Sequence, residues 1–120
     1  MTNEPDSIDA KELERLMEGR EALVIDVRET HEYEDEHIPG TVLYPLSFLD
    51  ADLLPPINNL KVVIVCQVGQ RSAAAGKQLI KEGFKDVVNL EGGLLAWKDA
   101  GLETEGAELE DDFPEPEPAK

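Results

Sequence analysis

The chain has 120 residues, which is enough for one domain with a hydrophobic core of its own. Its 27 acidic and 11 basic side chains give a net charge of -16, which argues against nucleic acid and anionic membranes as partners. No run of about 18 apolar residues is present, and the N-terminus lacks the basic start and apolar stretch of a secretory signal, so the sequence predicts a cytoplasmic protein that does not span a membrane.

The chain has a single cysteine, and this limits its chemistry further. Cys66 cannot form an internal disulfide and cannot build a metal site alone, so we expect neither a metal nor a cofactor. The acidic surface suits solubility or a salt-rich cytoplasm, or alternatively the recruitment of a basic partner protein.

The first half of the chain predicts strands and short helices behind a flexible stretch at residues 1–6. Asp9 and Glu12 have the spacing of a capping box, which starts a helix, and residues 23–27 form a compact apolar run typical of a buried strand. The elements expected after these are a polar helix over 30–36 capped by Thr30, a turn at Pro39–Gly40, a strand over 41–43 and a helical turn over 50–54.

The second half of the chain alternates strands and helices more clearly. Residues 62–65 are β-branched and apolar throughout, as in a central parallel strand that is covered on both faces. The elements expected after it are a helix from Ser72 to about Gly83, a strand over 87–90 and a helix over 94–100. We assign residues 7–103 to the folded domain and the acidic, proline-rich residues 104–120 to a disordered tail.

This alternation predicts an α/β domain with a mostly parallel sheet whose strands are joined by right-handed crossovers. In such sheets, ligands bind beyond the carboxyl ends of the strands. Three segments should lie at that edge, namely 26–28, 66–72 and 91–93. We therefore expect the functional residues in these segments.

The segment between the strongest strand and the next helix carries a nucleophile. Cys66 begins it, and the residues that follow are Gln67, Val68, Gly69, Gln70, Arg71 and Ser72. Gly69 permits a positive φ, so that the loop can curl and aim backbone N–H groups at the sulfur, and the following helix adds the partial positive charge of its N-terminus. A free thiol has a pKa of about 8.5, and we expect this anion-binding loop to make Cys66 mostly thiolate at neutral pH.

Each of these residues also has a structural interpretation. A buried cysteine can be an inert part of a core, although a core cysteine does not need a glycine-containing loop before a helix. Arg71 either contacts the substrate or connects the loop to a carboxylate such as Glu91 or Asp26. Asp26 and Arg28 are expected to support the loop, Asp26 by accepting N–H groups and Arg28 by pairing with a local acid.

Three motifs occur in a fixed order along the chain. Cys66-x-x-Gly69-x-Arg71-Ser72 lies in the middle. Residues 23–29 with Glu32–Tyr33 and 37–41 precede it, and residues 88–93 with Trp97 follow it. Together they resemble the signatures of the rhodanese family, the thiosulfate and related sulfurtransferases. The resemblance covers about residues 6–103 and implies a five-stranded parallel sheet with helices on both faces.

The resemblance implies covalent sulfur transfer. The thiolate of Cys66 attacks the outer sulfur of a donor such as thiosulfate or a persulfide, and the enzyme then holds that sulfur as a persulfide. An external thiol, cyanide or a protein sulfur acceptor takes the sulfur, because the chain has no second cysteine. The family's loop often carries basic residues where Gln67 and Gln70 stand here, so thiosulfate is expected to react slowly.

Two other functions stay open as alternatives. A rhodanese domain can act as a persulfide relay or protein-interaction module that docks a partner and has little turnover of its own. Related phosphatases carry one more residue between cysteine and arginine, whereas four residues separate Cys66 from Arg71 here. We therefore favour a sulfurtransferase in which Cys66 is the nucleophile and residues 67–72 form the substrate-binding loop.

Overall fold

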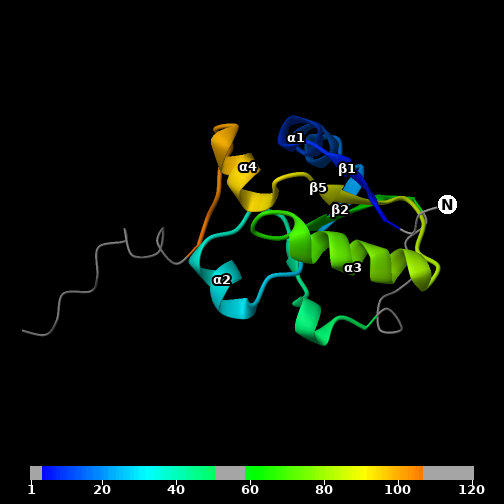
Figure 1. Ribbon diagram of the computed structural model, residues 1–120. Coiled ribbons are helices and arrows are strands. Elements are labelled where there is room, and N and C mark those ends of the chain that lie inside the picture. Colours follow the sequence, from blue (N-terminus) through cyan, green and yellow to red (C-terminus); the bar gives the residue numbers. More distant parts are fainter. Residues whose placement is uncertain (1–3, 51–58, 107–120) are drawn as a thin grey trace, which may run out of the picture.

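The computed structural model describes residues 4–50 and 59–106, in which strands and helices alternate along the chain (Figure 1). The strands are β1 (Asp6–Ile8), β2 (Ala22–Asp26), β3 (Val42–Leu43), β4 (Lys61–Val65) and β5 (Val87–Leu90). The helices are α1 (Ala10–Glu18), α2 (Thr30–Asp35), α3 (Gln70–Lys81) and α4 (Gly93–Asp99), with a 3-10 turn η1 (Leu46–Phe48). The helical turn expected over 50–54 and the tail expected over 104–120 lie mostly outside the described residues.

The five strands form one parallel sheet in the order β1-β5-β4-β2-β3. β4 lies at its centre, where Val63 is opposite both Val24 of β2 and Val88 of β5. A central parallel strand is covered on both faces, which is why β4 is buried at every position after Lys61. The predicted fold class, an α/β domain with a five-stranded sheet, is confirmed.

Alternate residues of β4 contribute to two hydrophobic cores, one on each face of the sheet. Val63 and Val65 belong to the core that α1 and α4 cover, whereas Val62 and Ile64 belong to the core that α3 covers (Figure 1). Helices therefore lie on both faces, as predicted. Among the helices of the described residues, none is long and apolar enough to cross a membrane.

The strand β1 was missed by the sequence analysis. Its three residues pair with β5 at one edge of the sheet, with Asp6 opposite Val88 and Ile8 opposite Leu90. A segment this short shows no periodicity, and its extended form depends on the hydrogen bonds that the edge of β5 offers. The ordered chain therefore begins at least one residue before the predicted boundary at residue 7.

The starts of two helices also differ from the prediction. The N-cap of α2 is Glu29 rather than Thr30, because the carboxylate of Glu32 accepts the backbone N–H of Glu29 at 2.9 Å in a capping box. α3 begins at Gln70 rather than Ser72. The second difference bears on the site, because it places the side chains of Arg71 and Ser72 on the first turn of a helix.

The chain returns to α2 after α4. The backbone N–H of His37 donates to the carbonyl of Glu105 at 2.8 Å, and Nε2 of His37 lies 3.0 Å from the Glu105 carboxylate. The hydroxyl of Thr104 donates to the carboxylate of Glu36 at 2.7 Å. Residues 104–106, which the sequence analysis assigned to the tail, are thus attached to the folded domain.

Candidate active site

The three segments expected to carry the function meet at the carboxyl edge of the sheet. The loop after β4 lies beside the start of α4 (Figure 1), where the N–H of Leu94 donates to the carbonyl of Cys66 at 2.8 Å. Arg28, which follows β2, donates to Oε1 of Gln67 in the same loop at 3.2 Å. Hydrogen bonds thus connect the Cys66 loop with the segment 26–28 and with Leu94, the residue directly after the segment 91–93.

Cys66 lies at the base of the loop and is only 1% exposed. Two groups reach its sulfur: the backbone N–H of Gly69, with N and Sγ 3.0 Å apart, and the hydroxyl of Ser72, with Oγ and Sγ 3.3 Å apart. Gly69 has a φ of 105°, which lets the chain turn back over the sulfur. Where we expected several amides, one amide and one hydroxyl among the described residues contact the sulfur.

The side chain of Arg71 pairs with Glu32 of α2. Its two terminal nitrogens donate to the two carboxylate oxygens of Glu32 at 2.7 and 2.9 Å. These bonds lower the pKa of Glu32 to about 2, and Glu32 in turn is the main cause that raises the pKa of Arg71, with smaller contributions from Cys66 and Asp26. The carboxylate that holds Arg71 is therefore Glu32, and the expected partners Glu91 and Asp26 were wrong.

Asp26 and Arg28 form a buried ion pair at the end of β2. Nη2 of Arg28 lies 3.0 Å from Oδ2 of Asp26, and both side chains are almost fully buried. Asp26 also accepts the backbone N–H of Arg28 at 2.9 Å. Arg28 pairs with a local acid as expected, whereas the Asp26 carboxylate accepts its hydrogen bonds from Arg28 and not from the loop. The pair acts on the site through Arg28, which holds the side chain of Gln67.

Asn89 of β5 belongs to the same cluster, and the sequence analysis did not single it out. Its Oδ1 accepts a hydrogen bond from Ser72, and its Nδ2 donates to the carbonyl of Gly69 at 3.1 Å. The signal in the sequence was an asparagine inside a strand that is otherwise apolar. A buried polar side chain requires hydrogen-bond partners, and Asn89 finds them in the loop.

In the part of the chain that the structure describes, the rim of the loop carries exposed apolar side chains and uncharged polar ones, and each arginine beside it is paired with a carboxylate. Val68 is 49% exposed, and Leu95, whose N–H donates to the carbonyl of Gln67 at 3.2 Å, is 43% exposed. Gln70 is exposed at the start of α3. Both arginines at the loop are held by carboxylates. The arrangement places a cysteine sulfur against the N–H of Gly69, with little net positive charge nearby to attract an anion.

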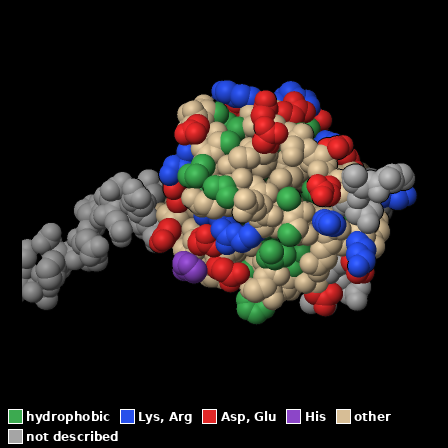
Figure 2. All heavy atoms as spheres, viewed as in Figure 1, with side chains coloured by type: hydrophobic (Ala, Val, Ile, Leu, Met, Phe, Trp, Pro, Cys, Tyr) green, Lys and Arg blue, Asp and Glu red, His purple; other side chains and the backbone are tan. Residues whose placement is uncertain are grey.

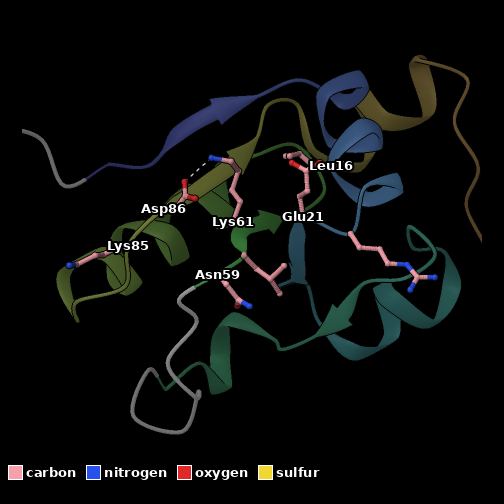
Figure 3. Close-up of a pocket in the computed structure, with 8 residues that line it drawn as sticks. Leu16, Glu21, Asn59, Lys61, Lys85 and Asp86 are labelled. Carbon is pink, nitrogen blue, oxygen red and sulfur yellow. Dashed lines mark hydrogen bonds and ion pairs between the residues drawn. The ribbon is translucent and has the colours of Figure 1, made fainter.

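A separate pocket lies at the other end of the strands, beside the amino ends of β2, β4 and β5 (Figure 3). Its lining includes Leu16, Glu21, Asn59, Lys61, Lys85 and Asp86. Lys61 is paired with Asp86 at 2.7 Å, and Lys85 points away from both. Lys61 and Lys85 therefore do not converge on one point. Within the described part of the chain, no cluster of three or more histidine, cysteine, aspartate or glutamate residues is placed to hold a metal ion.

The chain is similar in sequence to several known proteins. A sulfurtransferase of Allochromatium vinosum is 32% identical over 85% of the chain and 94% of its own length. An uncharacterized protein of Synechocystis is 41% identical over 82% of the chain, and a putative sulfur carrier protein of Bacillus subtilis, YrkF, is 39% identical over 62%. The chain spans only 55% and 40% of the lengths of these two relatives.

Structural and family comparisons agree with these relatives. A crystal structure of a rhodanese-related protein from Thermoplasma volcanium superposes with a TM-score of 0.74 at 30% identity, over 83% of this chain and 97% of that one. The model of the rhodanese-like domain matches residues 9–100, which include the Cys66 loop and the segments that surround it. The chain therefore belongs to the rhodanese-like family, the family of the sulfurtransferases.

Proposed function

We propose that this chain is a sulfurtransferase that carries sulfane sulfur as a persulfide on Cys66. The observation that carries the proposal is the hydrogen bond from the N–H of Gly69 to the sulfur, at 3.0 Å, at the N-terminus of α3. This N–H donates to an anionic sulfur, and the helix terminus adds partial positive charge. An inert core cysteine would need neither.

The transfer has two steps in which sulfur–sulfur bonds are exchanged. The Cys66 thiolate attacks the outer sulfur of a donor such as thiosulfate, a new bond joins the two sulfurs, and the donor's own bond breaks with its electron pair leaving on sulfite. A thiol or cyanide then attacks the outer sulfur and releases the Cys66 thiolate. Because Cys66 is 1% exposed, the donor must present its sulfur as a slender terminal atom, as thiosulfate and persulfides do.

The charges around the loop favour persulfide donors over thiosulfate. Thiosulfate is a dianion, and the guanidinium groups of Arg71 and Arg28 are each paired with a carboxylate. Gln67 and Gln70 add no charge. We therefore propose that thiosulfate is used slowly and that a donor of lower charge is used faster, with sulfur passing to an external thiol, a protein acceptor or cyanide.

A persulfide relay is the second candidate. The exposed side chains of Val68 and Leu95 flank the loop and could contact a protein acceptor. A relative of this chain is named a putative sulfur carrier protein. In this case Cys66 would take up sulfur but pass it to cyanide or a small thiol only slowly.

The experiment separates the two candidates by mass and by turnover. The protein is incubated with thiosulfate or with an alkyl persulfide, and intact-mass spectrometry measures the addition of one sulfur atom. Cyanide is then added and thiocyanate is followed, with Cys66→Ala as the control. Sulfur uptake and turnover that both vanish in Cys66→Ala support the enzyme, and uptake without turnover supports the relay. Absence of sulfur uptake from both donors would contradict both, and hydrolysis of a phosphate ester would favour a phosphatase.

A further inference from the structure

The hydroxyl of Ser72 lies between two acceptors. Ser72 is completely buried in the first turn of α3, its Oγ is 3.3 Å from Sγ of Cys66, and it also hydrogen-bonds to Oδ1 of Asn89. A hydroxyl has one hydrogen, so Ser72 can donate to only one of these two atoms at a time. Which of them receives the hydrogen decides whether Ser72 favours a thiol or a thiolate at Cys66.

The orientation of Asn89 decides the direction of this hydrogen bond. Nδ2 of Asn89 donates to the carbonyl of Gly69 at 3.1 Å. If the amide were turned over, its oxygen would face that carbonyl, and two acceptors would meet with no hydrogen between them. Oδ1 therefore faces Ser72 and takes its hydrogen, and Ser72 presents only lone pairs to the sulfur.

We propose that Asn89 is a positioning residue that holds the Ser72 hydroxyl away from the Cys66 sulfur and so restrains formation of the thiolate. Lone pairs on Oγ suit a protonated thiol, whose hydrogen they accept, and not an anion. The N–H of Gly69 acts in the opposite direction, since it donates to the sulfur. The proposal deepens the proposed function, because it names the residue that sets the reactivity of Cys66 before sulfur is taken up.

The charged groups around the loop come from four parts of the fold. They lie at the end of β2 and just after it, on α2 and α3, and in the turn between β5 and α4: Asp26, Arg28, Glu32, Arg71 and Glu91. None of these five residues is itself changed when Asn89 is replaced by an apolar residue. A change in the titration of Cys66 in such a variant therefore reports on the hydrogen bond and not on a lost charge.

The test measures the alkylation of Cys66 by iodoacetamide as a function of pH. Each profile is divided by its plateau at high pH, so that access to the buried sulfur cancels and the midpoint reports the thiolate. In Asn89→Leu, the freed Ser72 hydroxyl donates to the thiolate, and we expect the midpoint to fall by about one pH unit, which makes alkylation about tenfold faster below it. Ser72→Ala should remove this effect, so that Ser72→Ala and the double variant have the same midpoint.

An unchanged or higher midpoint in Asn89→Leu would overturn the proposal, as would an equal shift in the presence and absence of Ser72. A purely structural role of Asn89 would lower the melting temperature and leave the midpoint where it is. If Asn89→Leu does not fold, Asn89→Ala replaces it in the same comparison. Iodoacetamide requires only a thiolate, so the midpoints can be read even if the protein takes up no sulfur from any donor.

Discussion

Gly93 allows the first turn of α4 to approach the backbone of the Cys66 loop. It has a φ of 60°, and a Cβ on it would overlap the carbonyl oxygen of Cys66 and lie 2.6 Å from that of Gln67. Backbone atoms cannot rotate aside as a side chain would. The N–H groups of Leu94 and Leu95 donate to the same two carbonyls, so this contact anchors the loop.

We expect Gly93→Ala to lower the free energy of unfolding by about 3 kcal/mol, from the positive φ and from overpacking against the loop. Gly101→Ala is the matched control, since Gly101 has a φ of 80° and its added Cβ would have no atom within 4 Å. The control should cost about 1 kcal/mol. Urea unfolding followed by circular dichroism measures both, and equal costs would show that the loop contact contributes nothing.

At the scale of the elements, α2 depends on its neighbours. It has six residues and no buried one, and a helix this short is not stable alone. Glu32 connects it to Arg71 of α3, and Glu36, its C-cap, connects to Lys98 of α4 at 2.8 Å. Because α2 buries no hydrophobic side chain, we attribute its position beside the loop to these ion pairs.

The pair between Glu32 and Arg71 should make stability depend on pH in the acid range. The folded-state pKa of Glu32 is about 2, against an ordinary value of 4.5. Its contribution is therefore fully present above pH 4.5 and is lost as the pH falls toward 2. Because the side chain of Arg71 is 39% exposed, we expect a contribution of about 1 kcal/mol, well below the value that the full pKa shift implies.

The variant Glu32→Gln tests this dependence. We expect it to be less stable than the unsubstituted protein at pH 7, with the difference smaller at pH 3 by roughly half of that 1 kcal/mol. Urea unfolding at both pH values gives the free energies. Glu12→Gln is the control, because Glu12 pairs with Arg15 within α1 on an exposed surface and connects no second element. A difference for Glu32→Gln that does not change with pH would refute the assignment.

At the scale of the whole molecule, the net charge of -16 acts on every anionic reagent that approaches Cys66. Acidic and basic side chains are interspersed on the face that carries α2, α3 and α4 (Figure 2). On this face, the acidic side chains do not gather into one patch.

We expect the alkylation of Cys66 by iodoacetate, an anion, to become several-fold faster when the salt concentration rises from about 0.01 to 0.15 M, as the Debye length falls from about 30 to 8 Å. Iodoacetamide is neutral, and its rate should stay constant. Both rates are followed as loss of free thiol at constant pH. If salt raised the alkylation rates of the two reagents equally, it would be acting on the thiolate or on access to it, and not on the repulsion of the anionic reagent.

Local sequence determined where most of the strands and helices form and where the candidate nucleophile, Cys66, lies. The β-branched run over 62–65 predicts a central strand because such side chains fit a pleated sheet and crowd a helix. The capping box of Asp9 and Glu12 predicts α1, and Gly69 predicts the turn over Cys66. Each of these signals involves residues a few positions apart, so the sequence displays it directly.

Only the tertiary structure decided the pairings between distant residues. β1 is a strand because β5 offers an edge to it, Arg71 pairs with Glu32 across 39 positions, and Ser72 meets Asn89 across 17. Such contacts depend on the order of the strands in the sheet and on which helix covers which face. Local propensity carries no information about either, and for this reason the residues that surround Cys66 were identified only partly before the fold was known.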